Sequence, residues 1–254
     1  MEGNYFSGSL LKEIGRLQKL EKISLGSINL FGPILSSLGN LTSLIELYLN
    51  INRFARNIPP SLGDYQHLLK LEVSNNNLTG IIPKEVFGLS SLSISLRTYD
   101  NHLLLHCYLK LVFCCIMLVC LNLESNSFQG IIPQSLKSLR SLEDMDLSRS
   151  NLSEQIPEFL CKFKFLTHLN LSYNNFEGKM HESGIFSNAP GLSILGNPKL
   201  YGGNSKLHLP ACPNIKPHSS RGLLARKVVI HVACALAFLI AMSCFIVAYS
   251  MLKK

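Results

Sequence analysis

Few residue patterns in this chain of 254 residues could carry chemistry. Asp144 and Asp146 form the sharpest pair, because two neighbouring carboxylates could act as general acid and general base. Both are expected on one open strand, with no oriented base and no cleft beside them, so we expect no acid–base catalysis. The eight cysteines show no C-x-x-C spacing, and we therefore predict neither a zinc site nor any cofactor.

Composition and charge exclude two further classes of protein, disordered chains and nucleic-acid-binding proteins. Apolar residues make up 47% of the chain and charged residues 16%, which is typical of a folded rather than a disordered chain. Six of the 24 Lys and Arg residues lie in residues 213–254, where there is no acid, so the remaining chain is close to neutral. Because no basic stripe with interleaved aromatic residues appears, we expect no nucleic-acid partner.

A long apolar segment lies near the C-terminus. Residues 228–252 read VVIHVACALAFLIAMSCFIVAYSML and contain no Asp, Glu, Lys or Arg. As a helix they would be about 37 Å long, enough to cross a hydrocarbon core of about 30 Å. We predict a single transmembrane helix in contact with lipid, preceded by a juxtamembrane linker at 213–227; a buried core helix is the alternative. Basic residues flank both ends, so charge does not orient the helix, and the chain does not open with a secretory signal.

Leucine recurs with a period of 24 residues over most of the chain. Each unit follows the pattern L-x-x-L-x-L-x-x-N-x-L-x-G-x-I-P-x-x-L-x-x-L, which predicts a short strand with alternate side chains inward. One coil cannot bury its apolar face alone, so coils must stack into a solenoid. We assign residues 1–190 to this solenoid, with units that begin near residues 20, 44, 68, 92, 118, 142 and 166.

The asparagine of each unit has a separate task. Its amide can satisfy backbone groups at the bend after the strand, which cannot join a sheet. The glycine permits a sharp turn, and the proline fixes an extended segment. The predicted ladder of structural asparagines comprises Asn52, Asn76, Asn101, Asn126 and Asn174.

Several units depart from this pattern. Ile28 and Ser150 replace the ladder asparagine, and Arg56 and Glu154 replace the turn glycine. Residues 104–117 are the largest irregularity, because the turn glycine and the proline are both missing there. We interpret this stretch as an irregular coil. A second membrane span is the alternative, and a central lysine, which is costly inside a membrane, disfavours it.

These units resemble the plant-type leucine-rich repeat, an α/β-type solenoid of short parallel strands. The resemblance extends to the last repeats and outer cap of plant leucine-rich-repeat receptor-like kinases. The segments that carry it are GLSSLSIS at 88–95, EFLCKFKFLTHLNLSYNNFEG at 158–178, and GIFSNAPGLSILGNPKLYGG at 184–203, ending in LPAC at 209–212. The resemblance implies repeats outside the cell at the plasma membrane, a single span, and a Ser/Thr kinase inside.

Two features differ from that family. The sequence contains no Gly-rich phosphate loop, catalytic-loop Asp or D-F-G after the apolar segment, so we expect that this chain is not an enzyme. The family carries L-C-G-G where this chain has Leu200-Tyr201-Gly202-Gly203. We therefore interpret residues 191–212 as a degenerate C-terminal cap in which Cys212 has no obvious partner.

The outward strand positions would form a concave face of mixed charge, which suits a peptide or protein ligand, and a co-receptor kinase is a further candidate partner. The predicted binding residues are Glu46, Tyr48, Lys70, Glu72, Asn122, Glu124, Asp144, Asp146, Arg149, His168 and Tyr173. N-x-S/T sequons indicate glycosylation at Asn40, Asn77, Asn151 and Asn170.

We therefore hypothesise a membrane-anchored receptor-like protein that acts in defence or developmental signalling. It would recognise its partner without catalysing a reaction. The alternative is a non-functional, truncated fragment of a receptor-like kinase gene.

Overall fold

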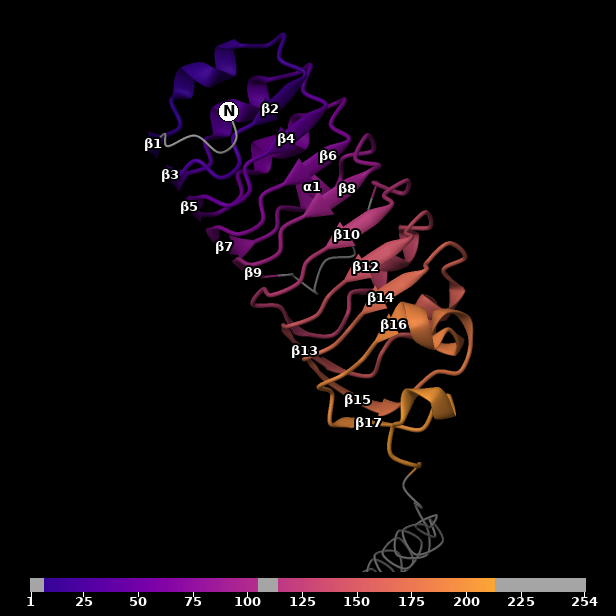
Figure 1. The fold of residues 1–254 in the computed structure, drawn as a ribbon. Coiled ribbons are helices and arrows are strands. Elements are labelled where there is room, and N and C mark those ends of the chain that lie inside the picture. The colour runs from indigo at the N-terminus through magenta and orange to yellow at the C-terminus, as the bar shows by residue number, and fades with distance from the viewer. Residues whose placement is uncertain (1–6, 105–113, 213–254) are drawn as a thin grey trace, which may run out of the picture. The chain divides into compact units, whose positions relative to one another are not determined.

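A computed structural model describes residues 7–104 and 114–212, all of which belong to one compact unit. Each repeat forms one coil, and successive coils stack so that strands about one repeat apart in the sequence become neighbours (Figure 1). The fold is therefore the expected solenoid of short parallel strands, and every strand pair in it is parallel.

One face of the solenoid is an uninterrupted eight-stranded sheet, here called the concave sheet. In most of its three-residue strands the middle residue points to the core while its two neighbours lie closer to solvent, as the alternation of side chains in a strand requires. Leu47, Leu71 and Leu121 are such middle residues, and all are fully buried. In order along the stack the strands are β2 (Lys22–Ser24), β4 (Glu46–Tyr48), β6 (Lys70–Glu72), β8 (Ser95–Arg97), β10 (Cys120–Asn122), β12 (Asp144–Asp146), β14 (His168–Asn170) and β16 (Leu192–Ser193).

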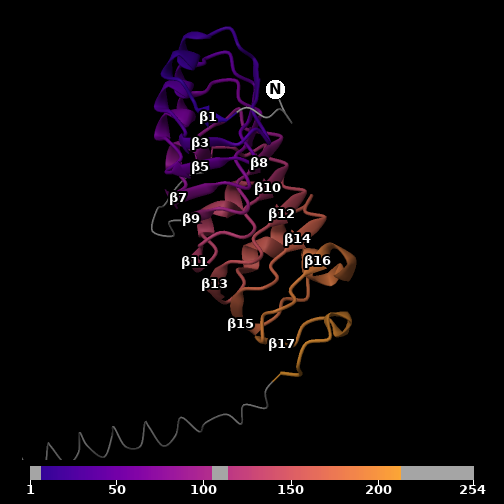
Figure 2. The same cartoon turned by 60° about the vertical axis from the view of Figure 1, so that its left-hand side comes forward.

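The strands that follow the bend form a second sheet, which is divided into two parts (Figure 2). Residues 105–113, outside the described ranges, lie between the two parts in the sequence, and among the described residues the Ser127 N–H donates to the Leu103 carbonyl of β9 at 3.0 Å. The first part holds β1 (Gly8–Ser9), β3 (Leu30–Pro33), β5 (Arg53–Arg56), β7 (Asn77–Ile81) and β9 (His102–Leu104). The second holds β11 (Gln129–Gly130), β13 (Asn151–Glu154), β15 (Asn175–Lys179) and β17 (Lys199–Tyr201).

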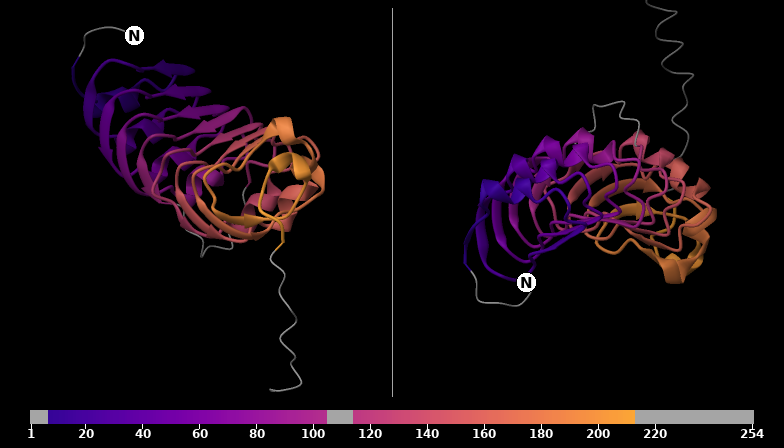
Figure 3. Two further views of the ribbon diagram at one scale, coloured as in Figure 1. Left: turned by 60° about the horizontal axis from the view of Figure 1, so that its bottom comes forward. Right: turned by 90° about the horizontal axis from the view of Figure 1, so that it is seen from above.

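Short helices occupy the outer side of the stacked coils (Figure 3). They are η1 (Lys12–Arg16), η2 (Ser36–Asn40), η3 (Pro60–Asp64), α1 (Lys84–Phe87), η4 (Gln134–Ser138), η5 (Glu158–Lys162) and η6 (Gly184–Ser187). Pro59, Pro133 and Pro157 stand directly before η3, η4 and η5. Proline has a fixed φ and no N–H, so it fits the extended residue from which such a turn begins.

Helices are short throughout the described unit. No helix in residues 7–104 and 114–212 is long and apolar enough to cross a membrane. The segments predicted as a transmembrane helix, 228–252, and as its linker, 213–227, lie outside the described residues.

The concave sheet crosses the irregular stretch at 104–117 without a break. β8 pairs with β10 in register, and Cys120 lies opposite Ser95. Leu118 is fully buried, as its equivalent Leu142 is, so the core resumes directly after this stretch. Cys115 is also fully buried and adds to the core as a small apolar side chain.

Residues 191–212, predicted as a degenerate cap, add strands to both sheets. β16 pairs with β14, and β17 pairs with β15. The chain then folds back, because the Gly202 N–H donates to the Pro210 carbonyl at 2.8 Å. A Cβ added at Gly202 would lie 3.0 Å from the Cys212 sulfur. Cys212 is an exposed, free thiol next to the segment in which Tyr201 stands.

Candidate functional site

A column of buried asparagine side chains supports the bend after each concave strand. Asn101 shows the arrangement: its Oδ1 accepts from the Leu78 N–H at 2.9 Å, and its Nδ2 donates to the carbonyls of Val73 at 3.1 Å and Thr98 at 3.0 Å. Val73 and Thr98 lie on neighbouring coils, so one amide ties two coils together. The same kind of bonding is made by Asn52, Asn76, Asn126 and Asn174.

The sequence analysis missed one member of this column, Asn197. Its Oδ1 accepts from the Phe176 N–H at 3.1 Å, and its Nδ2 donates to the carbonyls of Leu171 and Ile194 at 3.0 and 2.9 Å. The residue stands one repeat after Asn174, in the segment that we interpreted as a degenerate cap. Its spacing from Asn174 was the signal that could have revealed it.

The predicted binding residues lie along one surface. Glu46, Tyr48, Lys70, Glu72, Asn122, Asp144, Asp146 and His168 stand on the concave strands, and Glu124, Arg149 and Tyr173 stand in the segments that follow them. The parallel register places equivalent residues of successive coils side by side, so that Glu46 lies between Lys22 and Lys70. The sheet therefore arranges these side chains in rows.

At the N-terminal end of the concave sheet the charges are balanced. The Glu46 carboxylate contacts the Lys22 Nζ at 2.8 Å and the Lys70 Nζ at 3.5 Å. The hydrogen bond from Lys22 is the largest cause that lowers the pKa of Glu46; burial opposes it, and the charges of Lys22 and Lys70 add to the lowering. The Lys22 Nζ also lies 5.1 Å from the centre of the Tyr48 ring, within the range of a cation–π contact.

Towards the C-terminal end of the concave sheet the surface is acidic. Burial raises the pKa of Glu124, and the nearby carboxylates of Asp146 and Asp100 raise it further. The Arg149 Nε lies 3.3 Å from the Glu124 carboxylate and opposes this shift. Arg149 also stacks over Tyr173, with its guanidinium carbon 4.8 Å from the ring centre. A single arginine therefore faces several carboxylates in this part of the surface.

Arg149 and Tyr173 are held at the surface by an unusual backbone. Both residues adopt a left-handed conformation, with φ of 52° and 54°. Residues at the same place in other coils, among them Asn75 and Ser125, do so as well. Residues other than glycine rarely adopt a positive φ. The bend therefore holds Arg149 and Tyr173 in this conformation at a cost in backbone strain.

A chain of hydrogen bonds connects the acidic coils. Asp146 accepts from the Ser148 hydroxyl at 2.6 Å and from the Asn170 amide at 2.9 Å. Asn170 in turn accepts from the Ser172 hydroxyl, and the Ser193 hydroxyl donates to that of Ser172 at 3.3 Å. The three serines were not among the predicted binding residues. Their hydroxyls hold the carboxylate and amide in fixed orientations.

Between the two ends lies a pair that the sequence analysis also missed. Arg97 and Cys120 stand diagonally on the neighbouring strands β8 and β10, where Arg97 lies opposite Asn122 and Cys120 opposite Ser95. Burial raises the pKa of the Cys120 thiol, and the attraction of Arg97 only partly offsets this. Cys120 is therefore a neutral thiol at physiological pH, and Arg97 contributes the charge.

The sequon asparagines differ in their surroundings. Asn40, Asn77 and Asn151 are exposed. Asn170 is half-buried, and its Nδ2 donates to Asp146 and to the Ser148 hydroxyl. A glycan at Asn170 would have to replace these bonds and would cover part of the concave sheet.

The arrangement fits recognition rather than catalysis. The carboxylates of Asp144 and Asp146 stand on one open strand, and Asp146 is bonded to Ser148 and Asn170 instead of to a base. Within residues 7–104 and 114–212 no group of three His, Cys, Asp or Glu side chains could hold a metal ion. The surface presents rows of polar groups that are held by hydrogen bonds between coils.

The architecture and its asparagine column define a class, the leucine-rich-repeat proteins. A family model described as "Leucine rich repeat" matches residues 117–176, and a second of the same description matches residues 67–89 and 165–188. The chain's relatives are plant leucine-rich-repeat receptor-like kinases, of which it covers only a fragment.

Two relatives from Arabidopsis thaliana illustrate this. A probable LRR receptor-like serine/threonine-protein kinase is 44% identical over 103 residues, which is 39% of this chain and 10% of that protein. The LRR receptor-like serine/threonine-protein kinase EFR is 33% identical over 121 residues, 47% of this chain and 12% of that protein. The matches cover the repeat region, which is itself not catalytic.

Solved structures share the fold. The Arabidopsis receptor kinase HAESA, in complex with the peptide hormone IDA and the co-receptor SERK1, has a TM-score of 0.69 at 29% identity, over 79% of this chain and 33% of that one. A plant ice-binding protein has a TM-score of 0.70 at 25% identity, over 84% of this chain and 66% of that one. Proteins of different function share this solenoid, so function has to be argued from the surface.

Proposed function

We propose that this chain is the recognition part of a membrane-anchored receptor-like protein, whose concave sheet binds a peptide or protein partner outside the cell without catalysing a reaction. The observation that carries the proposal is the uninterrupted concave sheet, whose polar side chains are tied to one another across coils. Side chains that are already ordered lose little freedom on binding. The HAESA complex supports the proposal, because that related repeat structure holds a peptide hormone and a co-receptor.

The charges on the surface indicate the character of the partner. Glu124, Asp144 and Asp146 make the C-terminal coils acidic, whereas Lys22 and Lys70 flank a single carboxylate near the other end. A partner that lies along the sheet would place basic groups on the acidic coils. Complementary charge of this kind favours specificity and rapid association.

A display library of random peptides, screened against the full chain, tests this proposal. Arg149→Ser and Tyr173→Asn introduce residues that other coils hold at the same left-handed position, namely Ser125 and Asn75. We expect selected peptides to lose affinity by about tenfold in these variants, about 1.4 kcal/mol. Lys84→Gln, on an exposed residue of α1, is the control. Peptides that are insensitive to both concave variants would contradict a concave binding site.

Anchoring and orientation need a separate experiment. The full chain, expressed with a tag in plant cells, should resist alkaline extraction from membranes and lose mass when endoglycosidase is added. We expect Asn40→Gln, Asn77→Gln and Asn151→Gln to remove glycans, and Asn170→Gln to leave the mass unchanged because that amide is bonded within the concave sheet. An unglycosylated, extractable chain would rule out an extracellular, anchored receptor.

A further inference from the structure

The outer side of the solenoid holds a basic cavity that the concave surface does not include. It has a volume of about 930 Å³ and lies across two neighbouring coils, at η4 and η5. Lys137, Arg140 and Lys164 line it, and none of the three has a carboxylate partner among the described residues. Lys162 pairs with Glu158 at 3.3 Å, and no other carboxylate belongs to the lining. The cavity therefore carries a local excess of positive charge.

Phenylalanine side chains line the same cavity. Phe165 is 59% exposed, and Phe159 packs edge-on against Phe163 with ring centres 5.9 Å apart. The preceding coil has Ser141 at the place of Phe165 and Ser135 at the place of Phe159. The repeat therefore does not require an aromatic ring at either place. Phe163 is 9% exposed and belongs to the core, and Phe159 packs partly against the core, so Phe165 offers the most open ring face of the three.

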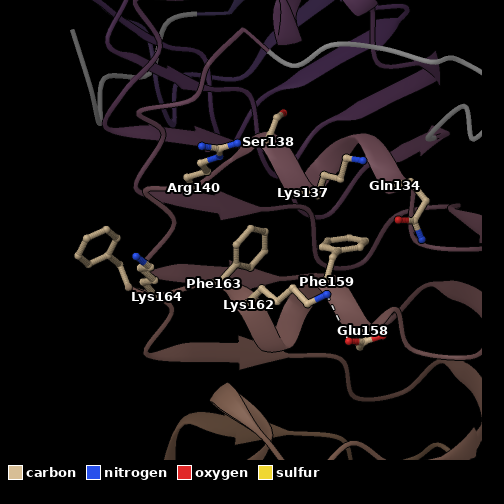
Figure 4. A pocket seen from close by; sticks show the side chains of 10 residues that line it. Gln134, Lys137, Ser138, Arg140, Glu158, Phe159, Lys162, Phe163 and Lys164 are labelled. Atoms are coloured by element: carbon tan, nitrogen blue, oxygen red, sulfur yellow. Dashed lines mark ion pairs between the residues drawn. The ribbon is translucent and has the colours of Figure 1, made fainter.

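The arrangement of charges and rings restricts the chemical class of ligand that the cavity can bind. In Figure 4 the rings of Phe159 and Phe163 lie between Lys137 and Arg140 on one coil and the lysines of the next. A ligand that fits must offer apolar faces to the rings and negative groups to the flanking cations. Inorganic phosphate has no apolar face. A sugar ring exposes C–H groups on its face, and a uronic acid adds one carboxylate to every sugar.

We propose that this cavity binds an acidic polysaccharide made of uronic acids, with sugar faces on the phenylalanine rings and carboxylates on Arg140, Lys137 and Lys164. The site lies on the outer side of the coils, so it is independent of the partner proposed for the concave sheet. Single-stranded nucleic acid also combines flat and anionic groups. Its binding grooves follow about 4–16 nucleotides, whereas these cations are confined to two coils.

The sequence analysis did not single out this site. Four of its lining residues form the short run Lys162-Phe163-Lys164-Phe165, where basic and aromatic residues alternate. Between Arg140 and Lys164 the chain runs through β12, β13 and η5 before it returns to the same side. Stacking of the coils adds Lys137 and Arg140 to that run.

The test measures binding of a galacturonic acid oligomer to the full chain by calorimetry. We expect binding that weakens as salt is added, because charges are screened. Arg140→Gln combined with Lys164→Gln should weaken it by about tenfold. Phe165→Ser, which introduces the residue of the preceding coil, should weaken it without changing its dependence on salt. Lys84→Gln removes a cation from the outer side at another coil and should have no effect.

The probes also separate the alternatives. The same oligomer with its carboxylates methyl-esterified keeps the sugar faces but loses the charge, and we expect it not to bind. Absence of binding by the acidic oligomer, or equal binding of the esterified one, would overturn the proposal. Tighter binding of single-stranded RNA or of dextran sulfate would also overturn it, since the site would then select phosphate or sulfate rather than uronate.

Discussion

The two sheets of this solenoid respond differently to the irregular stretch at 104–117. The concave sheet continues from β8 to β10 with its register intact, whereas the described part of the second sheet reaches β9 and resumes at β11, after residues 105–113, which lie outside the described residues. On the second side β9 pairs with β7, and the Ser127 N–H donates to the Leu103 carbonyl at 3.0 Å, so backbone bonds reach across the stretch there as well. The comparison shows which interactions hold successive coils together where the repeat pattern is lost.

Side-chain bonds to the backbone join the coils before and after this stretch. Asn126 accepts from the N–H of Leu103, in β9 of the second sheet, at 3.1 Å and donates to the Thr98 carbonyl, at the bend after β8, at 3.0 Å. The second sheet depends on a turn in which Gly80 and Gly130 take positive φ values of 75° and 77°. The sequence has Leu105 at that place in the irregular unit. Arg56 and Glu154 stand at that place in two other coils, and β5 and β13 still pair with β7 and β15 there, so the second sheet forms without the glycine and carries a positive φ on a side chain instead.

The largest expected effect comes from breaking the asparagine column beside the irregular stretch. Asn101→Ala leaves the Leu78 N–H and the carbonyls of Val73 and Thr98 without this partner. Buried polar groups without partners cost about 1–3 kcal/mol each, and we expect the free energy of unfolding to fall by about 3 kcal/mol in total. Urea unfolding of the full chain measures this. Asn77→Ala, at an exposed position, should change it by less than about 0.5 kcal/mol.

A second variant should strengthen the concave side. Thr98 is fully buried at a core position where other coils have Leu or Val, and its hydroxyl has no hydrogen-bond partner among the described residues. Thr98→Val keeps the shape and removes the unpaired hydroxyl, so we expect a gain of about 1 kcal/mol. A loss of stability on urea unfolding would indicate that the hydroxyl is bonded after all.

The second sheet should respond to restored glycines. Arg56 and Glu154 adopt φ of 69° and 65°, at the place where other coils have glycine. Arg56→Gly and Glu154→Gly should each raise the free energy of unfolding by about 0.5–1 kcal/mol, because relief of backbone strain exceeds the entropy that glycine adds to the unfolded chain.

The reverse substitution is the control for this effect. Gly80→Ala should destabilise, since Gly80 has a φ of 75° and its added Cβ would lie 2.5 Å from the Asn57 side-chain oxygen. If glycine at position 56 lowered the urea midpoint, the positive φ of Arg56 would not be a source of strain in the folded chain.

The smallest expected effect concerns the acidic end of the concave sheet. Because the pKa of Glu124 is raised in the folded chain, the folded state keeps this proton to a higher pH than the unfolded state does. Stability therefore falls as the pH rises from the usual value of 4.5 through the folded pKa. Urea midpoints at about pH 4 and about pH 7 should show a smaller decline in Glu124→Gln than in the wild type.

The neighbouring arginine offers a matched variant. Arg149 lowers the pKa of Glu124, so Arg149→Gln should raise this pKa further and steepen the decline with pH. An identical pH dependence in all three proteins would show that Glu124 does not contribute to it.

Much of the fold could be predicted from the sequence because each repeat encodes its own local structure. The leucine period predicted the coils, and Asn101 was assigned to the ladder although its unit is irregular. Asn197 escaped because its segment was interpreted as a cap. The hydrogen bonds that distinguish Asn170 from the other sequon asparagines could not be predicted, because they depend on which residues of adjacent coils face each other.

By itself the sequence determined the solenoid, its parallel strands and which side chains point outward along the concave strands, since burial and turn formation act within one repeat. Only the tertiary structure decided how residues about one repeat apart combine. Stacking created the acidic coils around Glu124 and the basic, aromatic cavity between η4 and η5. The physical reason is that charge and ring contacts act over a few ångströms, and the stacking of coils sets those distances.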